Sequence, residues 1–173
     1  MDDRFTVRQS VFDTAAGGGP GGLPGRLCRL LRGDLAMDAV TISLLGHGPY
    51  QHVCYASDAA ALDLEALHFA PGEGPSVRAT TLGRPVAADL RRHRGLWPAL
   101  RPPGRTQPPD AGALYAFPLR FRGRVLGSIG LIRHTPGALS EEEYERCAAA
   151  ADAVAVVLVD DFHHLGDDSP PSP

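Results

Sequence analysis

The chain has 173 residues, and all 17 of its side chains with a permanent positive charge are arginines because lysine does not occur; asparagine is absent as well. The length suits a single domain, and 43% hydrophobic with 21% charged residues indicates a globular chain. A P-loop and Schiff-base catalysis both require a lysine, so the composition excludes them. A genome of extreme GC content is the simplest origin of this bias.

The sequence lacks common signals for secretion, membrane insertion and metal binding. Its longest apolar run, around residues 148–159, contains Asp152 and is too short to span a bilayer, and no signal peptide opens the chain. Cys28, Cys54 and Cys147 are widely spaced, which predicts neither a disulfide framework nor a zinc site. We expect three buried thiols in a cytoplasmic protein that does not bind membranes.

The charge is unevenly distributed along the chain. Residues 1–134 carry 16 arginines against 11 acidic residues, whereas residues 135–173 carry one arginine against nine. The region from Arg84 to Arg133 is the most basic, but it has few aromatic residues and no recognisable nucleic-acid-binding motif. We therefore expect a solvated surface rather than a nucleic-acid partner.

The N-terminal part is predicted to be flexible before the first regular elements. Residues 1–25 include a glycine- and proline-rich stretch typical of a linker. A short helix is expected over residues 26–32, with Gly33 as its C-terminal stop. Apolar runs at residues 39–45 and 52–57 flank a glycine-containing turn and predict a β-hairpin.

The middle of the chain alternates helices with loops. Asp58 is placed to cap an amphipathic helix over residues 59–69. A glycine- and proline-rich loop then leads into a second helix before Gly83, and residues 84–88 are expected to form a short edge strand. Residues 91–111 contain too many prolines for a regular helix, and the role of this arginine-rich loop is left open.

The clearest hairpin joins residues 113–121 to residues 125–134 through a turn that contains Gly123. Pro118 lies inside the first of these runs, where its missing N–H indicates a bulge or an edge position. The order of elements along the chain predicts an α+β fold with an antiparallel sheet and helices on its faces.

The last helix has the strongest signals. Ser140 and Glu143 form a capping-box pattern, and the helix is expected to run to about His164. Its apolar side chains cover so much of the circumference that one face should pack on the sheet and another on a second copy. The expected dimer contacts are Tyr144, Ala151, Leu158 and Phe162. The acidic, proline-rich tail at residues 166–173 is expected to be disordered.

An ordered set of short motifs resembles the GAF domain family. The set comprises Phe69-Ala-Pro-Gly-Glu-Gly-Pro75, Gly83-Arg-Pro-Val86, Asp89-Leu90, Trp97-Pro98, Ala116-Phe-Pro-Leu119, Leu126-Gly127 and Thr135-Pro-Gly-Ala-Leu-Ser140. It is most similar to the GAF modules of actinobacterial regulators that often carry an ANTAR RNA-binding domain. The resemblance places a GAF domain at residues 26–165, and the 11 residues after Phe162 leave no room for such an output domain.

The resemblance implies a GAF (PAS-like) fold with a central antiparallel sheet of five to six strands, helices on both faces and a long C-terminal helix. It also implies a small-molecule pocket on one face of the sheet and terminal helices that often form a dimer on the other. Three departures stand out. Ser76 stands where these modules commonly have cysteine, the stretch after Trp97-Pro98 is broken by prolines, and the first helix is short.

Several activities found in the family require residues that this chain lacks. Free methionine-(R)-sulfoxide reductase needs a cysteine after the glycine-rich loop and another in the lid, but residues 77–146 contain none. Cyclic-nucleotide binding uses an asparagine- and lysine-containing signature, which is absent. Cys54 is a poor match for bilin attachment, and the histidines lie at turns and element ends, where haem ligation is disfavoured. No metal, haem or nucleotide signature identifies a cofactor.

A site for a small ligand is therefore the remaining expectation. The helix that begins after Gly72-Glu-Gly-Pro-Ser76 offers free N–H groups that suit a small anionic ligand, although a simple capped helix explains the same residues. The predicted ligand-binding residues are Thr41, Ser43, Tyr55, Phe69, Ser76, Tyr115, Phe117 and Ser128.

Two functions remain open from the sequence. The first is a stand-alone, non-enzymatic sensory module that binds a small molecule and signals through an unidentified partner protein or a change in its own dimer. The second is a GAF scaffold that only dimerises or binds a partner.

Overall fold

The computed structural model describes residues 3–20, 22–46, 52–69, 74–89 and 111–167. Five strands form one antiparallel sheet in the order β2-β1-β5-β4-β3. The strands are β1 (Ala39–Leu45), β2 (His52–Ala56), β3 (Val86–Asp89), β4 (Ala113–Phe121) and β5 (Arg124–Arg133). The helices are α1 (Asp3–Ala16), α2 (Gly22–Asp34), α3 (Ala59–Phe69), α4 (Pro75–Leu82) and α5 (Glu141–Asp167). This arrangement confirms the predicted α+β fold with five strands and a long C-terminal helix.

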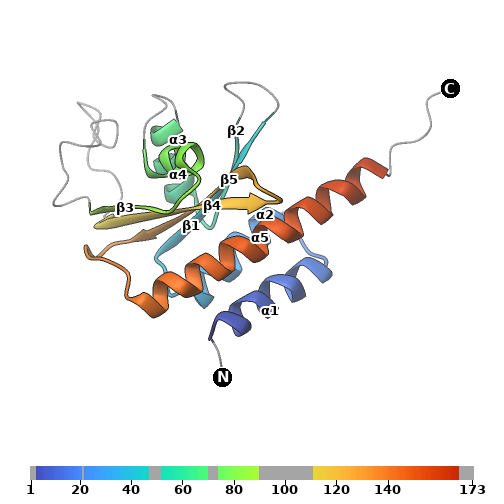
Figure 1. The fold of residues 1–173 in the computed structure, drawn as a ribbon, viewed down its shortest axis with the longest axis horizontal. Coiled ribbons are helices and arrows are strands. Elements are labelled where there is room, and N and C mark those ends of the chain that lie inside the picture. The colour runs from blue at the N-terminus through green and yellow to red at the C-terminus, as the bar shows by residue number, and fades with distance from the viewer. Residues whose placement is uncertain (1–2, 21, 47–51, 70–73, 90–110, 168–173) are drawn as a thin grey trace.

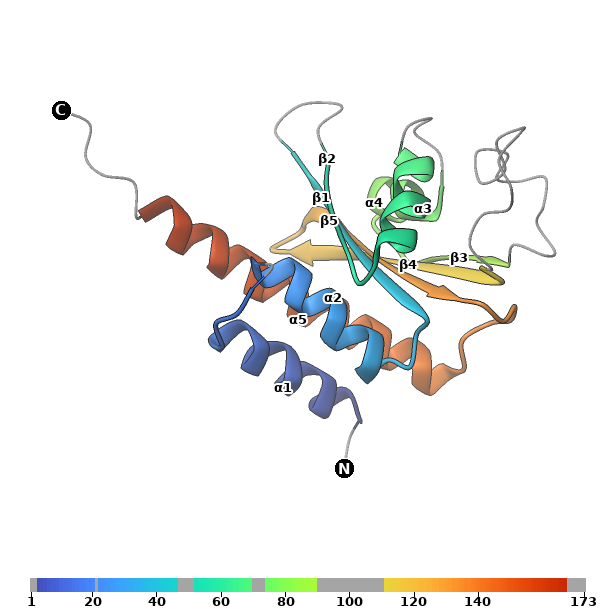
Figure 2. The ribbon, with the colours of Figure 1, turned by 180° about the vertical axis from the view of Figure 1, so that it is seen from behind.

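The helices divide between the two faces of the sheet. In Figure 1, α3 and α4 lie above the sheet, while α2 and α5 cover the opposite face. Helix α1 adds a further layer, because it packs on α5 and α2 rather than on a strand (Figure 2). The main apolar core lies between the sheet and the α2–α5 layer, and a smaller cluster lies under α3 and α4.

Helix α1 corrects the prediction of a flexible segment at residues 1–25. Val7 and Val11 are one helical turn apart and fully buried in the main core, so tertiary packing stabilises a helix with little amphipathic signal. The connection to α2 is held by Arg26, whose guanidinium donates to the carbonyls of Thr14, Gly17 and Gly19. Because these carbonyls are satisfied, the glycine-rich connection has a defined path.

Helix α2 is longer than the segment predicted over residues 26–32. It begins at Gly22, and Pro24 fits its first turn because a proline there removes no helical hydrogen bond. Gly33 lies inside the helix and does not end it. The chain leaves the helix at Ala36, whose φ of 51° is left-handed.

The predicted capping and turn signals are confirmed. The Ala61 N–H donates to the Asp58 carboxylate at 2.9 Å, at the start of α3. The β4–β5 turn places Arg122 and Gly123 at φ of 48° and 78°, as a tight hairpin turn requires. Pro118 pairs with Ser128 on β5, and the register shift that the sequence indicated follows between Leu119 and Arg120.

The capping box at the start of α5 also forms and is linked to the sheet. The Ser140 N–H donates to Glu143 Oε2 at 2.7 Å, and the Glu143 N–H donates to Ser140 Oγ at 3.2 Å. The other oxygen of Glu143 accepts from Arg133 at the end of β5. Arg133 in turn lies over the ring of Tyr115. These contacts fix the angle at which α5 leaves the sheet.

Candidate functional site

The candidate site lies on the sheet face that carries α3 and α4. Successive residues of a strand point to opposite faces, so Thr41 and Ser43 of β1 share one face. Antiparallel pairing places Gly130 opposite Thr41 and Ser128 opposite Ser43 on β5. The sheet therefore brings three hydroxyl groups together from segments that are far apart in the sequence.

Glu65 on α3 places a carboxyl group among these hydroxyls. Its side chain is only 3% exposed. The Thr41 hydroxyl donates to Glu65 Oε2 at 3.2 Å, and the Ser43 hydroxyl donates to Oε1 at 2.9 Å. The Ser76 hydroxyl also donates to this carboxyl group. Strand β1 and helix α4 thus both direct hydroxyl groups at one buried acid on α3.

Burial raises the pKa of Glu65 above its ordinary value, because a carboxylate loses solvation when water is excluded. The hydrogen bonds from Ser76, Ser43 and Thr41 oppose this shift by stabilising the charged form. The hydroxyls can also accept a hydrogen bond from the O–H of the neutral acid. Glu65 can therefore be held in either protonation state, with the neutral state favoured relative to a carboxyl group in water.

Ser128 is the one member of the group with an unused hydroxyl. Its side chain is fully buried, and within the described residues its Oγ has no hydrogen-bond partner. A buried hydroxyl without a partner costs free energy, about 1–3 kcal/mol in mutational data. The structure therefore leaves one polar group at this site available to a water molecule or a ligand.

Gly130 of β5 allows the close packing around the acid, and Gly127 allows the backbone of β5 to lie close to β1. A Cβ on Gly130 would lie 2.4 Å from Thr41 Oγ1 and 3.4 Å from Glu65 Oε2. A Cβ on Gly127 would lie 1.9 Å from the Ser43 backbone oxygen. Real Cβ atoms do not approach other atoms as closely as 2.4 or 1.9 Å. Any larger residue at either position would therefore displace the strand or the hydroxyl groups.

The N-terminus of α4 faces the same acid. Pro75 is the first residue of α4, and Ser76 follows it as a buried residue. The sequence predicted that this terminus would suit a small anionic ligand, but the chain places its own carboxyl group, Glu65, against Ser76. An external anion would meet this acid, so the geometry does not favour an anionic ligand here.

Three of the four predicted aromatic residues, those whose side chains the structure describes, do not join the polar group. Tyr115 and Phe117 are buried in the main core on the opposite face, and Tyr55 packs against that core. The Tyr115 hydroxyl donates to the Gly137 carbonyl at 2.7 Å, and the Phe117 ring lies 5.3 Å from the ring of Tyr144. Phe69 ends α3, and its side chain lies outside the described residues.

The thiols of the three cysteines are poor nucleophiles. Burial raises the pKa of Cys54 to about 11 and the pKa of both Cys28 and Cys147 to about 12. Cys54 is half-buried, and its sulfur lies 3.6 Å from Ser43 Oγ, whereas Cys28 and Cys147 belong to the opposite core. Reactive thiols require a lowered pKa, so this environment opposes thiol catalysis.

The predicted dimer contacts on α5 separate into two pairs. Ala151 and Leu158 are 2% and 1% exposed, because both pack in the main core of the same protomer. They are therefore not available to a partner, which corrects the prediction for these two residues. Tyr144 and Phe162 are 44% and 53% exposed and remain accessible.

The described residues contain no cluster of histidine, cysteine or acidic side chains that could hold a metal ion. Among the described helices, none combines the length and hydropathy that a membrane span requires. The structure does not describe the side chains of the histidines at positions 47, 52, 68, 93, 163 and 164. The tail at residues 168–173 and the predicted loop after Trp97-Pro98 also lie outside the described residues.

Glu65, the centre of the site, was not among the residues predicted from the sequence. A signal was nevertheless present. Glu65 follows the buried Ala61 by four residues, so it falls on the same, buried face of α3. An acidic residue on the buried face of a short helix requires buried partners, and Thr41 and Ser43 alternate on a neighbouring strand.

Comparisons with known proteins agree with this architecture. A family model described as GAF domain matches residues 25–158. No curated protein sequence matches the chain. The structure of the GAF domain from Acinetobacter phosphoenolpyruvate-protein phosphotransferase is similar, with a TM-score of 0.67, 15% identity, and coverage of 95% of this chain and 96% of that chain.

Two further solved structures have a similar fold. The GAF domain of a phosphoenolpyruvate-protein phosphotransferase from Coxiella burnetii has a TM-score of 0.70 and 14% identity, covering 95% of this chain and 97% of that one. Free methionine-R-sulfoxide reductase from Neisseria meningitidis, in complex with its substrate, has a TM-score of 0.61 and 13% identity, covering 93% and 89%. At such identities the likeness shows a shared fold only.

Proposed function

Because the chain belongs to the GAF domain family, we propose that it is a regulatory module that binds a small polar molecule at the Glu65 site. The signal would pass to a partner protein or through a change in its own dimer. The observation that carries this proposal is the buried Glu65 carboxyl group with hydroxyls from Thr41 and Ser43 directed at it, beside the unpartnered hydroxyl of Ser128.

The chemistry of the site favours a neutral or cationic ligand. Glu65 can accept hydrogen bonds from ligand N–H or O–H groups when charged, and it can donate one when neutral. The Ser128 hydroxyl can both donate and accept. A ligand that satisfies Ser128 would remove the cost of an unpartnered buried group, which gives binding a specific source of free energy.

A catalytic role is not proposed. Structures of free methionine-R-sulfoxide reductases share the fold, but the thiols of this chain have raised pKa values. Cys54, the cysteine nearest Glu65 and Ser43, is therefore held mostly as the thiol at neutral pH. A thiol in that state is a weak nucleophile, so binding without turnover is the function that these residues support.

The proposal is tested by ligand capture on the full chain. Native mass spectrometry of protein purified without harsh washing detects a retained molecule. Thermal-shift screening against amino acids, nucleosides, amines and organic acids identifies the chemical class. We expect Ser128→Ala and Glu65→Gln to weaken the binding of any compound that raises Tm in this screen. Ser10→Ala, on the distant helix α1, should leave the affinity for that compound unchanged.

The alternative of a ligand-free scaffold predicts a different result. In that case no molecule is retained, no compound raises Tm, and Ser128→Ala stabilises the protein by removing a buried unpartnered group. This outcome across a broad panel would contradict the sensory function and leave the fold unaffected.

A further inference from the structure

Exposed arginines gather at the end of the sheet where strand β4 turns into strand β5. Arg120 lies near the end of β4, Arg122 lies in the turn, and Arg124 is the first residue of β5. Arg84 follows the end of α4 by two residues. All four residues are exposed, and together they form the arginine cluster.

Two contacts hold the end of α4 against the hairpin. Arg120 Nη1 donates to the Gly83 carbonyl at 3.4 Å. The side chain of Val125 also lies next to Gly83, because a Cβ built on this glycine would be 3.8 Å from Val125 Cγ2. The fold therefore places Arg84 beside the hairpin turn, although the two segments are far apart in the sequence.

The charge of the cluster is not neutralised within the described residues, where none of the four arginines forms an ion pair. Arg120 donates to an uncharged carbonyl, and the Arg122 guanidinium lies 5.3 Å from the centre of the Phe121 ring. These contacts orient two of the side chains without adding a negative charge. Four neighbouring charges of one sign create a local positive potential that attracts anions.

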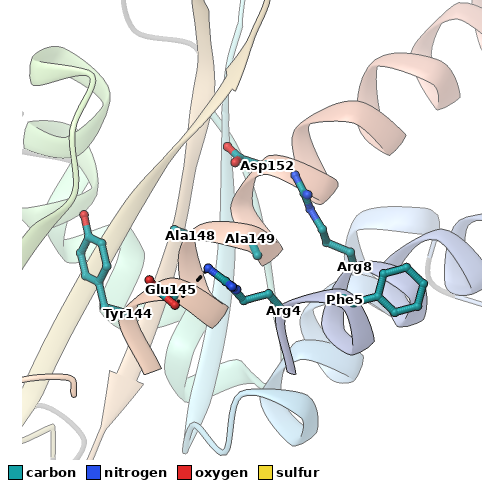
Figure 3. Close-up of a pocket in the computed structure, with 8 residues that line it drawn as sticks. All are labelled: Arg4, Phe5, Arg8, Tyr144, Glu145, Ala148, Ala149 and Asp152. Atoms are coloured by element: carbon teal, nitrogen blue, oxygen red, sulfur yellow. Dashed lines mark ion pairs between the residues drawn. The ribbon is translucent and has the colours of Figure 1, made fainter. Parts of the chain in front are cut away.

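The outer helices show a different charge pattern. Arg4 and Arg8 of α1 line a groove of about 460 Å³, and Glu145 and Asp152 of α5 line the same groove (Figure 3). Arg4 pairs with Glu145 at 3.2 Å. The charges of the groove are therefore balanced, whereas those of the arginine cluster all have one sign.

The arginine cluster lies at the ends of two elements that contribute to the Glu65 site. Helix α4 carries Ser76 near its start and leads to Arg84, and strand β5 begins at Arg124 and carries Ser128. At about 1.5 Å per helical residue and about 3.3 Å per strand residue, each hydroxyl lies roughly 12–13 Å along its element from the cluster. A ligand that binds Ser76 or Ser128 would act on the two elements that present the arginines.

We propose that the arginine cluster docks a short acidic segment of a partner protein. The planar guanidinium group matches a carboxylate with two parallel N–H donors, which favours acidic side chains as the occupants. Leu82, two residues before Arg84, is 45% exposed and offers an apolar contact beside the charges. That this partner receives the signal from Glu65 rests on the proposed function.

The surroundings of the cluster favour a short acidic segment over a nucleic acid or an anionic membrane. The whole chain has a net charge of −3, so a polyanion or a charged surface that extends beyond the cluster is repelled by the rest of the molecule. Single strands of nucleic acid also bind by stacking on aromatic rings, and the Phe121 ring already contacts Arg122. A short segment contacts the cluster alone.

Fluorescence anisotropy with a defined peptide tests the proposal. The probe is a fluorescein-labelled peptide of Glu-Glu-Leu repeats, about nine residues long, titrated with the full chain at about 150 mM salt. Arg84→Glu and Arg124→Glu should each raise the Kd of this peptide about tenfold or more, because each replaces an attraction by a repulsion. Arg84→Gln, which only removes the charge, should raise the Kd by a smaller factor.

Arg8→Glu on α1 is the matched control, because it makes the same charge change on an exposed residue away from the cluster. At this salt concentration distant charges are screened, so its Kd should stay within about twofold of the wild-type value. Matching thermal unfolding of the variants would show that the fold is preserved. If a charge reversal prevents folding, Arg84→Gln still tests the cluster.

No binding of the peptide at about 100 µM protein, or an equal loss of affinity in Arg8→Glu, would overturn the proposal. The same conclusion would follow if oligouridine RNA or phosphatidylglycerol vesicles bound the wild type more tightly than the peptide and lost affinity in Arg84→Glu. The test needs no compound at Glu65. A failed docking experiment would therefore leave the ligand screen unaffected, and a screen without a hit would leave the peptide result unaffected.

Discussion

The Ser43 hydroxyl donates to the Glu65 carboxyl group at 2.9 Å, in a position that solvent barely reaches. This contact joins strand β1, which carries Thr41 and Ser43, to helix α3, which carries Glu65. Its strength depends on the protonation state of Glu65, because a hydrogen bond to a charged acceptor is stronger than one to a neutral group. The folded state is therefore sensitive to pH at this residue.

The pH dependence of stability should change in the Glu65→Gln variant. Burial raises the pKa of Glu65 above its ordinary 4.5, so the folded protein binds this proton more tightly than the unfolded chain does. Stability from this group is present below pH 4.5 and is lost as pH rises through the folded-state pKa. We expect the Tm of Glu65→Gln to rise relative to that of the wild type as the pH increases from 4.5 through the folded-state pKa of Glu65.

Thermal unfolding of both proteins at matched ionic strength measures this difference. Asp63→Asn, which removes an acid from the exposed side of the same helix, is the matched control. A difference in Tm between Glu65→Gln and wild type that stays constant across the pH range would contradict the assignment.

The glycines of β5 should not tolerate a side chain. Gly127→Ala would place a Cβ 1.9 Å from the Ser43 backbone oxygen, so the strands must separate locally. We expect a loss of about 2 kcal/mol or more in the free energy of unfolding. Gly33→Ala, which lies in α2 with no other group within 4 Å, should instead gain about 0.5–1 kcal/mol.

Urea unfolding of the two variants gives both values directly. Because the chemical change is the same, their difference isolates the effect of the close strand approach. Equal effects at the two positions would show that β1 and β5 are not packed as closely as the structure places them.

Local sequence signals predicted much of the fold. The Asp58 cap, the Ser140–Glu143 box and the turn at Gly123 each depend on residues within a few positions of one another, so their chemistry can be read without a structure. Helix α1 could not be predicted in this way. Its stability comes from Val7 and Val11 packing in a core built by distant segments.

The candidate site shows the same division. Thr41, Ser43, Ser76 and Ser128 were selected as polar residues near a predicted pocket face, and the structure brings all four together. Glu65, which accepts hydrogen bonds from Thr41, Ser43 and Ser76, was missed because its role depends on the packing of α3 on β1, which local sequence signals do not predict. Tyr115 and Phe117 were predicted to lie at the ligand site, but they lie on the opposite face of the sheet. A strand alternates its faces, and odd positions of β4 point into the main core.

The ion pair between Arg133 and Glu143 should protect the protein against acid. The hydrogen bond from Arg133 lowers the pKa of Glu143 below its ordinary 4.5, with a further contribution from the Ser140 backbone. Stability from this group is therefore present above pH 4.5 and is lost as pH falls through the folded-state pKa. We expect Glu143→Gln to lower the free energy of unfolding at neutral pH. The difference in this free energy between the variant and the wild type should become smaller in acid.

Chemical unfolding at about pH 7 and about pH 3 tests this sign. Glu142→Gln, one residue earlier in the same helical turn, removes an equal charge without touching Arg133 and serves as the control. If both variants lose stability equally, the helix dipole and not the contact with Arg133 carries the effect.

Leu158 and Phe162 lie one helical turn apart on α5 but should respond differently to truncation. Leu158 is 1% exposed in the main core, so Leu158→Ala leaves a cavity and should cost about 2–5 kcal/mol of the free energy of unfolding. Phe162→Ala removes a side chain that is 53% exposed and should change stability by less than about 0.5 kcal/mol. Leu158→Asp changes a residue that the sequence alone placed among the dimer contacts, and it should unfold the protomer rather than dissociate a dimer. Circular dichroism during urea titration separates these results, and a folded, monomeric Leu158→Asp protein would show that this residue lies at an interface after all.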